Sequence, residues 1–151
     1  MHNVAFTLVQ KRVAAVRKIV ERWQIDHEES QFACDVEDIV TETASLLDPI
    51  QRITGQFEKG PQPESGADQF VSAHTVAFLL NEALRLFPKV NFLMGEVRHL
   101  GFVVEGLDRF EQSRSELVRI DIEFRKKWLL PDEQIVKAAK RDMVAGKCRI
   151  L

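Results

Sequence analysis

Apolar residues in the first part of the chain recur at alternating steps of three and four, the spacing that places side chains along one face of a helix. This pattern predicts one helix over residues 4–24 and a second that starts with Ser30 as its N-cap and runs for about four heptads. The predicted seam positions are Phe6, Val9, Val13, Val16, Val20 and Trp23 in the first segment, and Phe32, Val36, Ile39, Thr43, Leu46, Ile50, Ile53 and Phe57 in the second. Only residues 25–29 separate the two segments, and such a short connection indicates an antiparallel helical hairpin.

Proline and glycine interrupt this pattern at two places. Pro49 lies within the second seam, where it has no N–H to donate and clashes with the preceding turn, so a kink or break is expected near Leu47. Residues 60–66 contain two prolines and two glycines, a composition that excludes regular structure. We therefore expect a single helical domain over residues 1–151, with a hairpin at 1–59, a linker at 60–67 and a second half at 68–151.

The second half carries two further amphipathic segments. The first is expected to begin with Asp68 as its N-cap and to end at Pro88. Its apolar face is wider than a narrow seam, which indicates contacts on more than one side, because of four additional residues: Val76, Phe78, Leu79 and Leu86. The second segment covers residues 90–107. It is interrupted by three glycines, which either permit close packing or mark a bend: Gly95, Gly101 and Gly106.

Residues 117–125 fit two kinds of structure. Apolar and charged residues alternate there, as in a half-buried strand, but a helix also fits, because Arg119 and Glu123 would form an i,i+4 charge pair. The face of that helix would consist of Phe110, Leu117, Ile120, Phe124 and Trp128. We favour the helix, since no convincing partner strand is visible. With a short terminal helix over residues 133–144, the chain is predicted to be all-α: an antiparallel helical bundle of four to five helices with an N-terminal heptad-patterned hairpin and a short C-terminal helix.

Composition sets limits on size and location. With 151 residues, 45% of them hydrophobic and 29% charged, the chain has the makeup of one globular domain. Its longest uninterrupted apolar stretch, Val76 to Leu80, is too short to cross a bilayer, and residues 1–3 lack the features of a signal peptide. Neither Cys34 nor Cys148 has a Cys or His at metal-ligand spacing, so neither a disulfide framework nor a zinc site is expected. These features predict a cytoplasmic protein.

Charge is unevenly distributed, although the formal net charge is only −2. Residues 1–24 hold five basic groups and one acidic group, whereas residues 25–60 hold nine acidic and two basic groups. From residue 125 onward there are eight basic and three acidic groups. The basic first helix is therefore expected to lie against an acidic second helix, which leaves the basic tail as the main unpaired charged surface.

Motifs that carry chemistry are few. Glu96 and His99 have the Glu-x-x-His spacing of bundle metal ligands, but a di-iron site needs a second such pair, so solvated side chains are the preferred interpretation. Residues 72–75, Ser-Ala-His-Thr, resemble the phosphoacceptor helix of histidine phosphotransfer domains, which implies that His74 accepts a phosphoryl group. We favour the alternative, a histidine at the edge of an apolar face. The sequence contains no phosphate loop or nucleophile elbow, and we expect a protein that is not an enzyme and has neither metal nor cofactor.

The last four residues, Cys148-Arg149-Ile150-Leu151, resemble a CaaX box. The resemblance implies that a prenyltransferase attaches a lipid to Cys148, and a terminal leucine favours geranylgeranyl. Basic residues upstream would then supply a second, electrostatic membrane signal: Lys137, Lys140, Arg141 and Lys147. An accidental match in a chain that never meets such an enzyme is the other interpretation.

The absence of chemistry favours a function based on binding. We expect an adaptor, a chaperone-like protein or an assembly subunit that presents helix faces to a protein partner or to another copy. The predicted partner-binding residues are Phe32 and Phe57, at the ends of the second seam, and Lys126, Lys127, Lys137, Lys140 and Arg141 in the basic tail. Two alternatives remain open. One is a nucleic-acid-associated subunit that uses Lys11, Lys18 and Arg22, and the other is a peripheral membrane protein anchored through Cys148.

Overall fold

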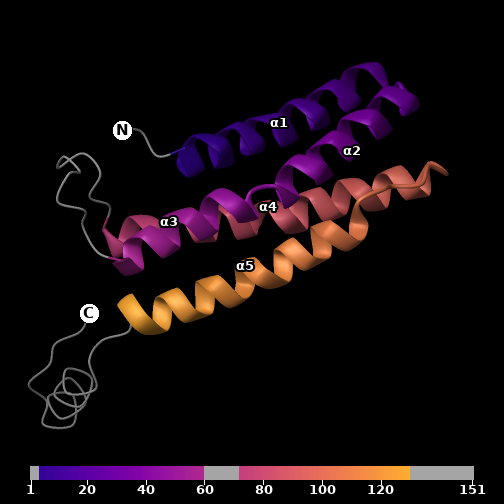
Figure 1. Ribbon diagram of the computed structural model, residues 1–151. Helices are drawn as coiled ribbons and strands as arrows, with labels where there is room; N and C mark the ends of the chain where they lie inside the picture. The colour runs from indigo at the N-terminus through magenta and orange to yellow at the C-terminus, as the bar shows by residue number, and fades with distance from the viewer. Residues whose placement is uncertain (1–3, 60–71, 130–151) are drawn as a thin grey trace, which may run out of the picture.

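The computed structural model describes residues 4–59 and 72–129, and within them the chain forms a bundle of helices without strands (Figure 1). The helices are α1 (Val4–Asp26), α2 (Glu29–Ala44), α3 (Leu47–Lys59), α4 (Ala73–His99) and α5 (Leu107–Trp128). α2 and α3 follow one another along one pass of the bundle, so the chain crosses it four times in alternating directions. The prediction of an all-α antiparallel bundle is confirmed. The terminal helix predicted for residues 133–144 and the linker at 60–67 lie outside the described residues.

α4 lies at the centre of the bundle and contacts each of the other four helices. In Figure 1, α2 and α3 cross in front of α4, with α1 on one side of this pair and α5 on the other. α1 and α5 each pack against both α2–α3 and α4. Because the other described helices cover α4 from three directions, they leave one outer face of it in contact with solvent.

The seam predicted for α2 and α3 is buried, whereas the seam predicted for α1 is only partly so, because Phe6, Val13 and Trp23 are half-buried and Val20 is exposed. The seam residues of α2 and α3 are all buried except Phe57, which is partly buried. In α1, Val9 and Val16 are buried, but Ile19 takes the place predicted for Val20. The start of α2 was predicted two positions late, because Glu28 rather than Ser30 occupies the N-cap and makes no side-chain capping bond.

Pro49 produces the predicted interruption between α2 and α3. α2 ends at Ala44, and the chain then makes a tight turn in which the N–H of Leu46 donates to the carbonyl of Thr43 (3.1 Å). Pro49 is then part of the first turn of α3, where a helix leaves its backbone N–H groups unpaired, so the missing donor costs little. The buried hydroxyl of Ser113 on α5 donates to the carbonyl of Ala44 (2.7 Å), which satisfies a carbonyl at the end of α2.

Pro88 does not end a helix, which corrects the sequence-based prediction. α4 runs from Ala73 to His99 and contains Pro88 in its interior. A proline there costs roughly 3 kcal/mol or more, but apolar side chains on both sides of it are buried in the core of the bundle: Leu86, Phe87, Val90 and Leu93. This continuous packing keeps the helix intact. The predicted start at Asp68 is also wrong, because Ser72 caps α4 by accepting a hydrogen bond from the N–H of Thr75 (3.2 Å).

The predicted helix over residues 117–125 is confirmed as part of α5. Arg119 donates hydrogen bonds to Glu116 (2.8 Å) and to Glu123 (3.0 Å). The hydrogen bond from Arg119 to Glu116 holds the pKa of the Glu116 carboxyl below its usual value. α4 and α5 are joined by a loop in which Gly101 and Gly106 have positive φ angles of 95° and 81°. These two glycines therefore mark a bend, whereas Gly95 stays within α4 and no side-chain or distant backbone atom lies within 4 Å of where its Cβ would be.

Thr43 places a hydroxyl in the core without a hydrogen-bond partner among the described residues. Burial of an unpaired hydroxyl costs about 1–3 kcal/mol. We expect Thr43→Val, which replaces the hydroxyl with a methyl of similar size, to raise the free energy of unfolding by about 1 kcal/mol in urea denaturation. The matched control is Thr54→Val, because the buried hydroxyl of Thr54 donates to the carbonyl of Ile50 (3.0 Å) and should give no such gain. Equal effects of the two substitutions would contradict this account.

Candidate functional site

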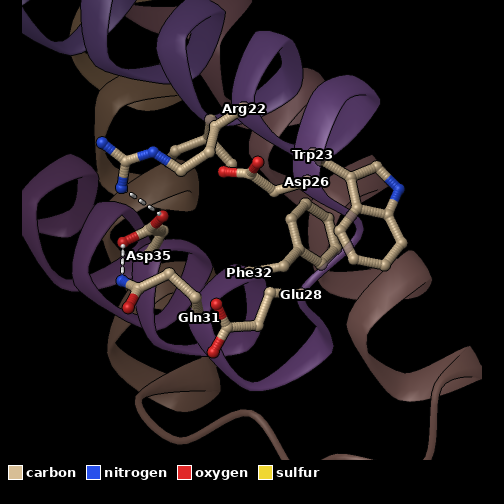
Figure 2. Close-up of a pocket in the computed structure, with 8 residues that line it drawn as sticks. Arg22, Trp23, Asp26, Glu28, Gln31, Phe32 and Asp35 are labelled. Atoms are coloured by element: carbon tan, nitrogen blue, oxygen red, sulfur yellow. Dashed lines mark hydrogen bonds and ion pairs between the residues drawn. The ribbon is translucent and has the colours of Figure 1, made fainter.

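Phe32 and Phe57, predicted to bind a partner, have aromatic neighbours within the same chain. Phe32 is 4% exposed and stacks on Trp23, with ring centroids 4.4 Å apart (Figure 2). Phe57 contacts Phe124 and Trp128 at centroid distances of 5.2 and 4.9 Å. The structure thus uses both side chains inside the bundle, and partner binding by them stays a prediction.

The basic side of α1 lies against the acidic side of α2, as the charge pattern predicted. Arg12 forms an ion pair with Glu42 (3.1 Å), and Arg22 forms one with Asp35 (3.3 Å). Asp35 also accepts a hydrogen bond from the side chain of Gln31 (2.9 Å), and Figure 2 shows the three side chains together. Each pair keeps one partner partly in solvent, and ion pairs at the surface contribute about 0–1 kcal/mol each, so these two orient the hairpin more than they stabilise it.

The proposed nucleic-acid face is therefore interleaved with carboxylates. Arg22 is paired, and Lys18 borders a surface hollow that is also lined by Asp35, Asp38 and Glu42. Carboxylates beside a basic row repel phosphates and weaken the electrostatic attraction on which nucleic-acid binding depends. Lys11 is exposed on α1. Nucleic-acid binding by these residues stays a prediction.

Two candidate sites for chemistry lie on the surface of α4. Glu96 and His99 are both exposed near its end, and His74 is exposed in its first turn. Within residues 4–59 and 72–129, no group of three or more His, Cys, Asp or Glu side chains could hold a metal ion.

The hollow at the tip of the α1–α2 hairpin, shown in Figure 2, is open to solvent and lined by Trp23, Phe32 and charged side chains.

The basic residues at the end of α5 are exposed. Arg125 pairs with Asp121 (2.8 Å), and the Nζ of Lys127 lies 5.4 Å from the centre of the Trp128 ring. Lys126 is exposed beside them. The other predicted tail residues lie outside the described residues: Lys137, Lys140, Arg141 and Cys148.

The outer face of α4 exposes two large aromatic side chains that the core does not use. Phe78 is 61% exposed and Phe92 is 67% exposed. They lie seven positions before and seven after the exposed Arg85, so that all three fall on one stripe, because seven residues make about two helical turns. We call this stripe, with the charged residues beside it, the α4 outer face: His74, Phe78, Glu82, Arg85, Lys89, Phe92 and Glu96.

Charged side chains flank the two phenylalanines. Arg85 lies between them and forms a long ion pair with Glu82 on the preceding turn (3.8 Å). Lys89 is exposed one turn after Arg85 and on the same flank as Glu82, seven residues away. The face thus combines two aromatic side chains and an arginine, residue types that are enriched in protein interfaces, with flanking charges of both signs.

Sequence reasoning missed this face because it ended the helix at Pro88. With the helix divided there, Phe78 belonged to one segment and residue 92 to another, and their common stripe was hidden. The available signal was the position of Phe78 outside the narrow seam.

Comparisons with known proteins identify no relative of this chain. No family model matches the chain, and searches of curated proteins and of solved structures found no match. Among the described residues, no helix has the length and apolar content needed to cross a membrane.

Proposed function

We propose that this protein is a non-enzymatic assembly or adaptor protein of the cytoplasm that binds a protein partner through the α4 outer face. The observation that supports the proposal is the exposure of Phe78 and Phe92 on one stripe of a well-packed helix. Burial of one such side chain is favourable by about 1.5–3 kcal/mol, so a partner that covers both phenylalanines would bind with a favourable contribution from each.

Other exposed apolar residues do not offer the same arrangement. Ile25 and Val103 are exposed singly at the hairpin tip and in the loop before α5, and isolated apolar side chains are ordinary on protein surfaces. Val118 and Ile122 lie one turn apart on α5, but they are smaller and less exposed than the two phenylalanines, at 36% and 49%. Phenylalanine pairs on one rigid helix provide anchors that lose little conformational freedom on binding. The α4 outer face is therefore the surface best suited to hold a protein.

The double variant Phe78→Glu/Phe92→Glu tests this proposal in cells that naturally produce the protein, treated with a chemical cross-linker before extraction so that a concentration-dependent complex survives dilution. We expect the wild-type protein to migrate in a complex larger than the monomer, and the double variant to migrate as the free monomer, because glutamates cannot enter an apolar contact without a large desolvation cost. Size-exclusion chromatography with detection of the tagged protein measures this.

The matched control is Ile25→Glu/Val103→Glu, which also replaces two exposed apolar residues but leaves the α4 outer face intact. Its complex should have wild-type size. If the α4 variant remained in the large complex, or if both variants left it equally, the assignment of the partner to α4 would be wrong.

A further inference from the structure

We propose that the partner on the α4 outer face is a second copy of this chain, docked with the two α4 helices antiparallel and a twofold axis close to Arg85. This inference rests on the proposed function and specifies its occupant. It is carried by the symmetry of the residue pattern about Arg85, which is what a twofold interface requires of the surface that forms it.

The apolar anchors match under this symmetry. Phe78 precedes Arg85 by seven residues and Phe92 follows it by seven, so an antiparallel pair centred on Arg85 places Phe78 opposite the partner's Phe92. The same operation places Phe92 opposite the partner's Phe78. All four rings, each more than half exposed in the single chain, become buried in two aromatic contacts.

The charges match in the same register. Glu82 precedes Arg85 by three residues and Lys89 follows it by four, on the same flank of the helix. In an antiparallel pair equivalent flanks meet, so Glu82 faces the partner's Lys89, and the contact occurs twice. His74 and Glu96, eleven residues to either side of Arg85, are brought opposite one another in the same way.

A parallel pair would lose this advantage. Only residues on the central stripe would then face their own copies, whereas the flanks that carry Glu82 and Lys89 would lie on opposite sides of the interface, so the two Glu82–Lys89 contacts would not form. The antiparallel pair has one unfavourable contact, Arg85 near the partner's Arg85 at the axis. The ion pair that each Arg85 makes with Glu82 of its own chain reduces that repulsion.

The pairing of single helices makes an interface at the small end of the known range, and we expect a dimer that depends on concentration. Sedimentation velocity of the purified full chain, from about 5 to about 500 μM, covers the range in which such interfaces form. The wild-type protein should shift from monomer to dimer, and Phe78→Glu/Phe92→Glu should remain monomeric throughout. Circular dichroism of each variant verifies that the bundle is folded.

Charge reversal distinguishes this geometry from any other contact. Glu82→Lys alone creates two Lys–Lys contacts and Lys89→Glu alone creates two Glu–Glu contacts, so each variant should dimerise on the order of tenfold more weakly than the wild type. An equimolar mixture of the two variants restores both opposite-charge contacts in the heterodimer. The mixture should therefore regain affinity close to that of the wild type, while Glu37→Lys, an exposed reversal on α2, should have no effect.

Three results would overturn the inference: a wild-type protein that stays monomeric over the whole range, single reversals that dimerise as well as the wild type, or a mixture that does not recover. These outcomes are separate from failure of the proposed function. A purified monomer that still loses its cellular complex through Phe78→Glu/Phe92→Glu would retain the α4 docking face and replace the second copy with a different protein.

Discussion

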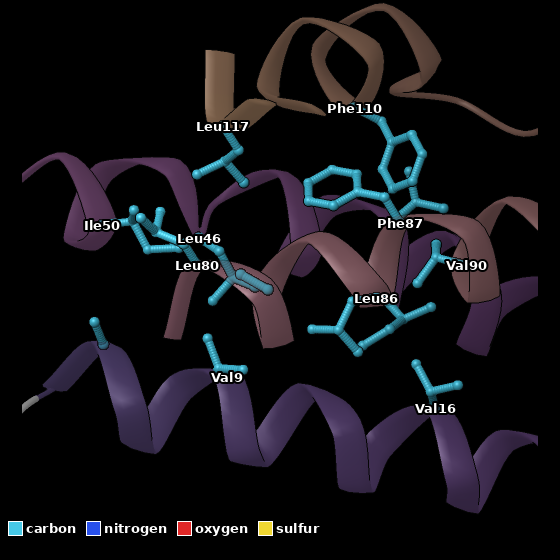
Figure 3. Packing of buried hydrophobic residues seen from close by; sticks show 14 of the residues in the cluster. Val9, Val16, Leu46, Ile50, Leu80, Leu86, Phe87, Val90, Phe110 and Leu117 are labelled. Atoms are coloured by element: carbon cyan, nitrogen blue, oxygen red, sulfur yellow. The ribbon is translucent and has the colours of Figure 1, made fainter. Parts of the chain in front are cut away.

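Phe87→Ala is expected to lower the free energy of unfolding by about 3–5 kcal/mol, because it removes a buried aromatic ring from the centre of the bundle. Phe87 is 1% exposed, and its ring centroid lies 4.9 Å from that of the fully buried Phe110, where α4 meets α5 (Figure 3). Truncation takes the ring away from both helices and leaves a cavity that the surrounding side chains fill only in part. Urea denaturation followed by circular dichroism measures the loss.

Phe92→Ala is the matched control, since it removes the same side chain from the same helix. Phe92 is exposed, so its loss should change the free energy of unfolding by no more than about 0.5 kcal/mol. Both variants should be measured at low protein concentration, where the proposed dimer is dissociated and cannot add to stability. Similar losses in the two variants would mean that the division of α4 into an inner and an outer face is incorrect.

Ser113→Ala is expected to destabilise the bundle by about 1–3 kcal/mol. The Ser113 hydroxyl is buried and donates to the carbonyl of Ala44 at 2.7 Å. That carbonyl belongs to the last residue of α2, and the last carbonyls of a helix have no N–H donor within the helix. Alanine at position 113 therefore leaves a buried acceptor unpaired. Thermal unfolding should report the loss as a lower Tm.

Ser115→Ala separates this bond from the general effect of removing a serine hydroxyl from a helix. Ser115 is exposed on the same helix, and alanine has the higher helix propensity, so this variant should be as stable as the wild type or slightly more so. A Tm that falls equally in both variants would show that the hydrogen bond from α5 to the end of α2 does not contribute to stability.

The buried seam could be predicted from the sequence because the side chains that face the core recur with the period of the helix. From Phe32 to Phe57 the steps of four and three continue across the interruption at Pro49, so the same face stays toward the core in α2 and α3. The break occurs within one turn, at Ser45 and Leu46, and this preserves the direction of the face. In α5, the four apolar positions from Phe110 to Phe124 that share one helical face are buried, whereas Val118 and Ile122, which the strand pattern would place on the same side, are exposed.

The two prolines within the described helices show where local rules are insufficient. Pro49 and Pro88 look alike in the sequence, yet only Pro49 separates two helices. The difference depends on tertiary packing. Leu86, Phe87 and Val90, immediately around Pro88, are all buried against neighbouring helices, and this offsets the cost of the proline. No pattern within α4 itself reveals how many helices will surround it.

The candidate site was beyond prediction for a related reason. An apolar residue outside the seam indicates either an additional intramolecular neighbour or a surface left for a partner, and the sequence does not distinguish them. The position of Phe78 predicts contacts on more than one side of its helix, and the structure leaves this side chain 61% exposed. Only the arrangement of α1, α2, α3 and α5 around α4 shows that the outer face has no intramolecular cover among the described residues.

The most direct test of a protein partner on α4 is site-specific photo-cross-linking in the cells that produce the protein. A photoreactive phenylalanine analogue at position 92 should give, on irradiation, a covalent adduct with one defined protein, which mass spectrometry identifies. The same analogue at position 115, exposed on α5, should give none. A defined adduct from position 92 alone is the predicted result. No adduct from position 92, or the same adduct from both positions, would contradict the central claim that the α4 outer face is the surface through which this protein acts.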